Sequence, residues 1–230
     1  MSRSGGSSHR IPLAAKRFKW EKRAMKALLG TKIGMTQIIG EDGVTTPVTL
    51  IQAGPCTVTQ VKSVETDGYN AVQVAFGEGK NLSKAVAGHV KSSKVTPKFI
   101  REFRVDELPD LKVGDTLDVS SFTLGDVVSA TGTSKGKGFA GTVKRHNFNT
   151  SKKTHGGNGN VRKVGSIGSM YPQKVFKGKR MPGRMGHEQV TVKGLKVAYI
   201  SLEDNLIGIK GAVPGPRKGL VTLNLKGGNL

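Results

Sequence analysis

The sequence predicts a mainly β protein: a closed antiparallel β-barrel with a long, irregular, basic extension inserted into it. Three observations support this fold class. Short segments that alternate apolar and polar residues lie on both sides of the chain's middle, and turn-forming residues bound them. The middle itself, residues 127–187, contains no aspartate or glutamate. The whole chain of 230 residues carries 37 lysines and arginines against 16 acidic residues, a formal net charge of +21.

Strand patterns begin soon after the N-terminal arm, in residues 26–126, where cations and acidic residues are mixed. Residues 34–54, GMTQIIGEDGVTTPVTLIQAG, alternate β-branched and polar residues around the turn signal EDG, which predicts a hairpin. Residues 56–77, CTVTQVKSVETDGYNAVQVAFG, predict a second hairpin around TDG. We expect a short helix in residues 83–93, SKAVAGHVKSS, and a strand in residues 99–105, FIREFRV. Residues 112–122, KVGDTLDVSSF, predict a further strand.

Three more strands are expected after the acid-free middle. Residues 189–201, 205–215 and 219–227 each show a two-residue alternation bounded by glycine, proline or asparagine. The regions on either side of the acid-free middle, which contain both cations and acidic residues, are together long enough for one sizeable core. The predicted organisation is therefore a basic N-terminal arm at 1–25, a barrel domain at 26–126 and 188–230, and an inserted extension at 127–187.

The extension has the composition of a segment that folds against a partner. It holds 13 of the 37 cations, 12 of the 32 glycines and three of the five histidines. Glycine loses much backbone entropy on ordering and the like charges repel, so the isolated segment is expected to be disordered. The large positive charge implies a polyanionic partner. No apolar run approaches the roughly 20 residues that cross a bilayer, so we expect no membrane partner and favour nucleic acid.

Other chemistries fit the sequence poorly. GKGFAG, Gly136 to Gly141, has the spacing of a dinucleotide-binding loop, but the next acidic residue, Glu188, lies 47 residues beyond it. A nucleotide-dependent oxidoreductase would need that acid nearer, so we expect no cofactor and no small-molecule substrate. His146 and His155 have no acidic neighbour to orient them, so we expect neither a catalytic residue nor a metal site. The single Cys56 excludes an internal disulfide and predicts a buried thiol.

The residues predicted to contact RNA are the cations of the extension, with histidines, glycines and one aromatic side chain among them. Cations neutralise phosphates, glycines allow close backbone approach, and Phe139 can pack on a sugar or base. They are Lys135, Gly136, Lys137, Gly138, Phe139, Gly141, Lys144, Arg145, His146, Lys152, Lys153, His155, Arg162, Lys163, Lys174, Lys177, Lys179, Arg180 and Arg184. The N-terminal arm is either a solvated basic tail or a further RNA-binding segment through Arg10, Lys16, Arg17, Lys19 and Trp20.

An ordered set of segments resembles the third universal family of large-subunit ribosomal proteins, ribosomal protein L-three, in its bacterial form. The segments are KALLGTKIGMTQI from Lys26, TGTSKGKGFAGTVKRHNF from Thr131, GSIG from Gly165, KVFKGKRMPGRMG from Lys174, VTVKGLKV from Val190 and KGAVPG from Lys210. The resemblance implies a closed six-stranded barrel of the translation-protein type and a structural, non-enzymatic role in the large subunit of a bacterial rather than organellar ribosome, in the cytoplasm.

The same resemblance implies specific partners. Family members bind the large-subunit 23S-type rRNA directly, nucleate early assembly near its 3′ end, and extend a basic loop toward the peptidyl-transferase centre. Their expected neighbours are the fourteenth and nineteenth families of large-subunit proteins. The chain departs from the family pattern at Ser129, in the SMYPQ segment and in residues 1–24, and no modification is carried over to Gln173. The alternative function is an RNA-binding assembly factor that leaves the mature particle.

Overall fold

A closed barrel of six antiparallel strands forms the centre of the protein. The computed structural model describes residues 26–40, 42–157 and 159–225. In barrel order, the strands are β1 (Ala27–Ile39), β12 (Leu220–Leu225), β7 (Val127–Thr133), β10 (Gln189–Ser201), β11 (Leu206–Lys210) and β2 (Thr45–Ala53). The predicted fold class is thus confirmed. The N-terminal arm, with Arg10, Lys16, Arg17, Lys19 and Trp20, lies outside the described residues.

Strands β1 and β2 form the first predicted hairpin. Their register runs from Ile39 opposite Thr45 back to Gly30 opposite Ala53, with one irregularity on the way. The turn is closed by hydrogen bonds between the backbones of Gly40, Gly43 and Val44, which is the place of the EDG signal. The three strands predicted after the acid-free segment are confirmed as β10, β11 and β12.

A second sheet packs beside the barrel, and we call residues 56–122 the small lobe. Its strands, in sheet order, are β5 (Pro97–Arg104), β4 (Ala71–Glu78), β3 (Cys56–Lys62) and β6 (Thr116–Leu117). Its helices are α1 (Val64–Asp67), α2 (Lys84–His89) and the 3-10 helices η1 (Lys91–Ser93) and η2 (Val119–Ser121). The predicted hairpin, short helix and strand are all present, but the last predicted segment is only a two-residue strand followed by η2.

The structure differs from expectation in where these lobe strands belong. We expected them in the barrel, and they form a separate four-stranded sheet. Strand β4 is buried on both faces from Ala71 to Phe76, so it lies between other layers of the molecule. Alternation of residue types identifies a strand and its buried side, but it does not specify the sheet that the strand joins.

The extension also begins later than the expected boundary at residue 127. Strand β7 occupies Val127–Thr133 and pairs with both β12 and β10, and Val128 and Ala130 are fully buried. The absence of acidic residues marks where the charge changes and does not mark where the barrel ends. From here on, "the extension" means residues 134–188, which connect β7 to β10.

The barrel and the small lobe share one hydrophobic core. The fully buried side chains include Leu28, Leu29 and Leu223 from the barrel and Val72 and Val74 from the lobe.

Cys56 lies at the junction of barrel and lobe. Its Sγ accepts a hydrogen bond from the amide of Leu29 at 3.4 Å, and the thiol donates to the carbonyl of Leu29 at 3.5 Å. Burial raises the pKa of this free thiol to about 11. The predicted buried thiol is confirmed.

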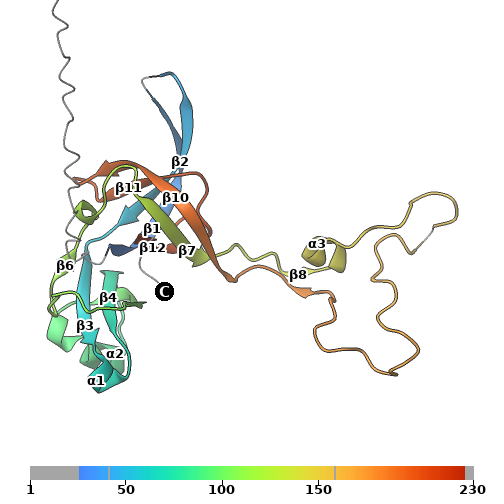
Figure 1. Cartoon of the computed structure of the whole chain (residues 1–230), viewed down its shortest axis with the longest axis horizontal. Coiled ribbons are helices and arrows are strands. Elements are labelled where there is room, and N and C mark those ends of the chain that lie inside the picture. The colour runs from blue at the N-terminus through green and yellow to red at the C-terminus, as the bar shows by residue number, and fades with distance from the viewer. Residues whose placement is uncertain (1–25, 41, 158, 226–230) are drawn as a thin grey trace, which may run out of the picture.

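Figure 1 shows how the parts are arranged. The small lobe lies on one side of the barrel, and the extension projects from the other side as a long loop with little regular structure. Its regular elements are β8 (Phe139–Ala140), α3 (Thr142–His146) and β9 (Gly183–Arg184). No helix among the described residues is long and apolar enough to span a membrane.

Candidate nucleic-acid interface

The part of the extension next to the barrel is a narrow two-stranded stem. The amide of Ser134 donates to the carbonyl of Glu188 at 2.8 Å, and the amide of Lys137 donates to the carbonyl of Met185 at 2.9 Å. The amide of Met185 donates in turn to the carbonyl of Gly138 at 3.0 Å. Strands β8 and β9 continue the pairing, with Phe139 opposite Arg184. The stem therefore continues the direction of β7 and β10 away from the barrel (Figure 1).

Helix α3 is tied across the stem by two side chains. Arg145 donates from Nη1 to the carbonyl of Met181 at 3.0 Å, and His146 Nε2 lies 3.2 Å from the same oxygen. Because a carbonyl only accepts, His146 must carry its proton on Nε2. We predicted these two residues as RNA contacts, and the structure also gives them this internal role. The Arg145 guanidinium keeps further N–H groups available for a phosphate.

Glycines allow the two legs of the stem to approach each other. A Cβ on Gly183 would lie 2.6 Å from Nη1 of Arg145, and one on Gly186 would collide with the carbonyl of Lys135. The sequence alone did not indicate a role for these two glycines. The predicted Gly138 and Gly141 instead have no heavy atom within 4 Å of an added Cβ, and Gly138 has a φ of +64°. Space for close approach by a partner exists at these two positions.

Several predicted cations surround one hollow where the stem meets the barrel. This hollow of about 680 Å³ is lined by side chains that include Lys135, Lys137, Arg145 and His146. Lys32 of β1 also faces it and donates to the carbonyls of Val213 at 2.6 Å and Gly215 at 3.3 Å. Burial and then the charge of Lys135 lower the pKa of Lys32. The sequence did not identify Lys32, because it occupies an ordinary strand position.

The far part of the extension, residues 148–182, has neither a core nor charge compensation. None of its described residues is buried, and its backbone hydrogen bonds are local, such as that from the Ser151 amide to the Val161 carbonyl. Predicted contact residues in this part are all exposed: Lys152, Lys153, His155, Arg162, Lys163, Lys174, Lys177, Lys179 and Arg180. Lys144 and Arg184 nearer the stem are exposed too. In the described part of the chain, no ion pair joins a cation of the extension to a carboxylate.

Large apolar side chains accompany these cations at the surface. Phe139 is 80% exposed, and Met170, Tyr171 and Phe176 are 88%, 82% and 60% exposed. Exposed aromatic side chains among cations are suited to stacking on bases or sugars. Of these four side chains, only Phe139 was predicted as an RNA contact; Met170, Tyr171 and Phe176 were not, although they lie in the same acid-free segment.

The described residues contain no group of three histidine, cysteine, aspartate or glutamate side chains placed to hold a metal ion. His155 is exposed, and His146 contacts a backbone carbonyl rather than a carboxylate. The arrangement therefore offers charge, hydrogen-bond donors and stacking surfaces to a large anion.

Comparison with known proteins gives a consistent family. Residues 105–204 match the family model described as Ribosomal protein L3. The large ribosomal subunit protein uL3 of Heliobacterium modesticaldum is 50% identical over 203 residues, which is 87% of this chain and 96% of the relative. The uL3 proteins of Corynebacterium diphtheriae and Petrotoga mobilis are 49% and 47% identical, over 89% and 86% of this chain and 96% and 94% of their own lengths.

Proposed function

The chain belongs to the ribosomal protein L3 family in its bacterial form, and we propose that it binds large-subunit rRNA directly through the extension. Family membership makes it a structural protein of the large ribosomal subunit. The extension supplies the contact with rRNA, and the barrel anchors the extension to the particle.

One observation carries this proposal: Glu188, at the end of the extension, is its single acidic residue, and its cations form no ion pair in the described part of the chain and, apart from the half-buried Arg145, are exposed. Thirteen lysines and arginines held without counter-charges repel one another, so the arrangement is favourable only beside a polyanion. The lack of a buried core in residues 148–182 means that the free extension has little to hold it in one conformation. Folded rRNA provides both the charge and the packing surface.

The expected mode of recognition is of RNA shape and phosphate pattern. Lysine and arginine neutralise phosphates, while Phe139, Tyr171 and Phe176 pack on exposed sugars or bases. The sequence of the extension contains no repeated side-chain motif of the kind that recognises individual RNA bases. Ordering of the extension against rRNA is coupled to binding, and its entropy cost is offset by the contacts formed.

The finer role follows from the family resemblance and is part of the proposal. The protein acts in the bacterial cytoplasm, binds early during assembly near the 3′ end of the 23S-type rRNA, and extends its basic loop toward the peptidyl-transferase centre. Members of the fourteenth and nineteenth large-subunit families are its protein neighbours. It performs no catalysis itself. The projection of the extension away from the barrel in Figure 1 supports a reach well beyond it.

The test is the salt dependence of binding to a fragment of large-subunit rRNA. Each neutralised phosphate contributes about −0.7 to −0.9 to the slope of log K against log salt. Charge reversal by Lys177→Glu, Lys179→Glu and Arg180→Glu is expected to flatten the slope by about two to three. The matched control is Lys193→Glu, Lys196→Glu and Lys210→Glu, which changes the net charge equally on exposed barrel positions.

Removal of the whole extension gives the larger effect. Thr133 and Gln189 lie directly opposite each other in the β7–β10 pair, so an Asn-Gly turn can join them as a hairpin. If half of the thirteen cations contact phosphate, this variant loses about four to six from the slope. A slope within one unit of the full chain would contradict the proposal. Loss of the protein from mature particles in high salt would favour the assembly-factor alternative.

A further inference from the structure

A second acid-free basic segment lies in the small lobe. Residues 79–101 contain no aspartate or glutamate, and they carry six cations: Lys80, Lys84, Lys91, Lys94, Lys98 and Arg101. The lobe as a whole, residues 56–122, has nine cations and nine acidic residues, so the cluster is not apparent from the net charge of the lobe. The segment runs through α2 and η1 into β5.

The structure leaves these six cations without counter-charges. All six are exposed, and in the described part of the chain none of them forms an ion pair. The neighbouring Glu102 is already engaged: Lys62 Nζ lies 2.7 Å from its Oε1, and the Tyr69 hydroxyl donates to its Oε2 at 2.9 Å. These contacts satisfy Glu102, so its carboxylate does little to neutralise the nearby lysines.

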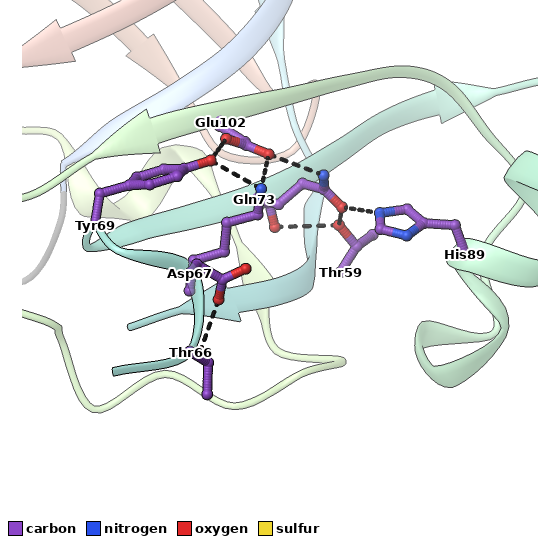
Figure 2. A network of polar contacts seen from close by, with 8 residues as sticks. Thr59, Thr66, Asp67, Tyr69, Gln73, His89 and Glu102 are labelled. Carbon is purple, nitrogen blue, oxygen red and sulfur yellow. Dashed lines mark hydrogen bonds and ion pairs between the residues drawn. The ribbon is translucent and has the colours of Figure 1, made fainter. Parts of the chain in front are cut away.

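A polar network holds the basic segment against the sheet (Figure 2). His89, at the end of α2, lies with Nε2 2.9 Å from Oε1 of Gln73, and the Thr59 hydroxyl donates to the same oxygen at 2.8 Å. The amide nitrogen of Gln73 donates to Glu102 at 3.3 Å. Because Oε1 only accepts, His89 must be the donor. Gln73 is almost fully buried, so the network fixes the position of α2.

Further contacts fix the helical part of the segment, residues 83–93. Ser83 caps α2 by accepting the amide of Val86 at 3.4 Å. Val90 and Ser93 are buried, and the Ser93 hydroxyl donates to the Val90 carbonyl at 2.8 Å. The lysines between these anchors are therefore presented by an ordered backbone. Cations on an ordered support lose less conformational entropy when they bind, in contrast to those of residues 148–182.

One face of strand β5 adds to the same surface. Glu102 of β5 lies opposite Gln73 of β4, and Gln73 contacts His89 of α2. The face of β5 that carries Glu102 is therefore on the side of the sheet that α2 covers. Alternation along the strand places Lys98 and Arg104 on that side with Glu102. Arg104 also lies over the ring of Tyr69, 5.1 Å from its centroid. Lys98 and Arg104 of the strand thus lie on the same side of the sheet as α2, whereas Arg101 lies on the opposite face of β5.

We propose that this basic segment of the small lobe is a second RNA-binding surface, which contacts rRNA phosphates independently of the extension. It rests on the proposed rRNA-binding function and adds a site within it. A protein partner fits less well, because lysine is depleted at protein interfaces and the segment offers only Val86 as an exposed large apolar side chain. Figure 1 places the lobe and the extension on different sides of the barrel, so one rRNA engages two separated surfaces.

The test adds one variant to the salt series on the full chain. Lys84→Glu, Lys91→Glu and Lys94→Glu reverse three exposed charges without touching the anchors Val90 and Ser93. We expect the slope for the rRNA fragment to flatten by about two to three, as for the extension triple variant. Thermal unfolding of each variant confirms that it is folded. Lysine acetylation provides a second readout, in which RNA protects Lys84, Lys91 and Lys94 in the wild type.

The outcomes separate this proposal from the function it rests on. If the extension variant flattens the slope and the lobe variant does not, the rRNA-binding function stands and the second surface is disproved. If neither variant changes the slope, both proposals fail. Equal flattening by the lobe variant and by the barrel control would show an effect of net charge alone and would contradict the lobe site. Acetylation that RNA leaves unchanged, while an acidic protein suppresses it, would assign the surface to a protein partner.

Discussion

The barrel and the extension are parts of one chain that reach an ordered state by different means. In the barrel, Leu28, Leu29, Ile51 and Leu223 are completely buried, and each strand pairs with two neighbours. In the extension, only Ala140 and Thr142 are buried among the described residues. The comparison teaches that strand alternation encodes a barrel with its own core, whereas charge and glycine encode an extension that, under the proposed function, folds against a partner.

The physical reason is the balance between burial and conformational entropy. Ordering one residue costs about 1–2 kcal/mol of backbone entropy, and burial of apolar side chains is what offsets it. The barrel and lobe share one core that provides this burial. None of the described residues in 148–182 is buried, so under the proposed function contacts with rRNA offset the entropy cost of ordering them.

The largest expected difference between the two regions concerns apolar side chains. Leu28→Ala removes a completely buried side chain and should lower the free energy of unfolding by about 2–5 kcal/mol. Phe176→Ala removes a side chain that is 60% exposed and should change it by less than about 0.5 kcal/mol. Chemical denaturation of both variants measures the two values. A similar loss of stability in both would mean that the extension belongs to the core.

Alkaline pH sharpens the comparison through Cys56. The folded-state pKa is about 11, above the ordinary value of 9.0, so the folded state holds the thiol proton more tightly than the unfolded state. The contribution of the protonated thiol to the free energy of unfolding is fully present below the ordinary pKa and is lost as pH rises toward 11. We expect wild type to lose about 2 kcal/mol more than Cys56→Ala between pH 8.5 and 10.5.

Denaturant unfolding at several pH values measures this difference. Because lysines and tyrosines titrate in both proteins, the variant is the matched control for their contribution. Parallel pH profiles for the two proteins would show that Cys56 ionises as easily in the folded state as in the unfolded one.

Glycines distinguish the regions in a third way. A Cβ on Gly30 would lie 2.7 Å from the Gln52 carbonyl and 2.7 Å from Ile51 Cγ2, so Gly30→Ala should destabilise the barrel by about 1–3 kcal/mol. A Cβ on Gly138 has no heavy atom within 4 Å, and the positive φ of this residue strains only the extension in Gly138→Val. We expect its barrel to unfold as wild type does and its binding to rRNA to weaken. Calorimetry and RNA binding report the two effects; a lowered melting temperature for Gly138→Val would connect the stem to the core.

The smallest expected effect is at the tie across the stem. Arg145→Ala removes the hydrogen bond to the Met181 carbonyl, a contact with a typical value of about 0.5–1.5 kcal/mol. Exchange of the Lys137 and Met185 amides should become about threefold to tenfold faster. Barrel amides such as that of Val197 serve as the internal control. Unchanged exchange in the stem would mean that the backbone pairing there does not need Arg145.

The sequence predicted the barrel strands well because their alternation reports directly which face is buried. It did not predict the separate lobe sheet, since β4 is buried on both faces, nor β7, since Val127–Thr133 falls inside the acid-free segment. In the candidate site, composition alone identified the exposed cations. Lys32, Gly183, Gly186 and the Met181 carbonyl were missed, because their roles arise from contacts between residues far apart in the chain.

Hydrogen exchange of the full chain, free and bound to an rRNA fragment, tests most directly the claim that the barrel folds alone and the extension folds on its partner. In the free protein, paired amides of β1, β2, β10 and β12 should be protected, and amides of residues 148–182 should exchange at nearly unprotected rates. Binding should protect residues 148–182 and leave the barrel almost unchanged. Strong protection of residues 148–182 in the free protein would contradict the account, and so would a lack of protection of these residues in the complex.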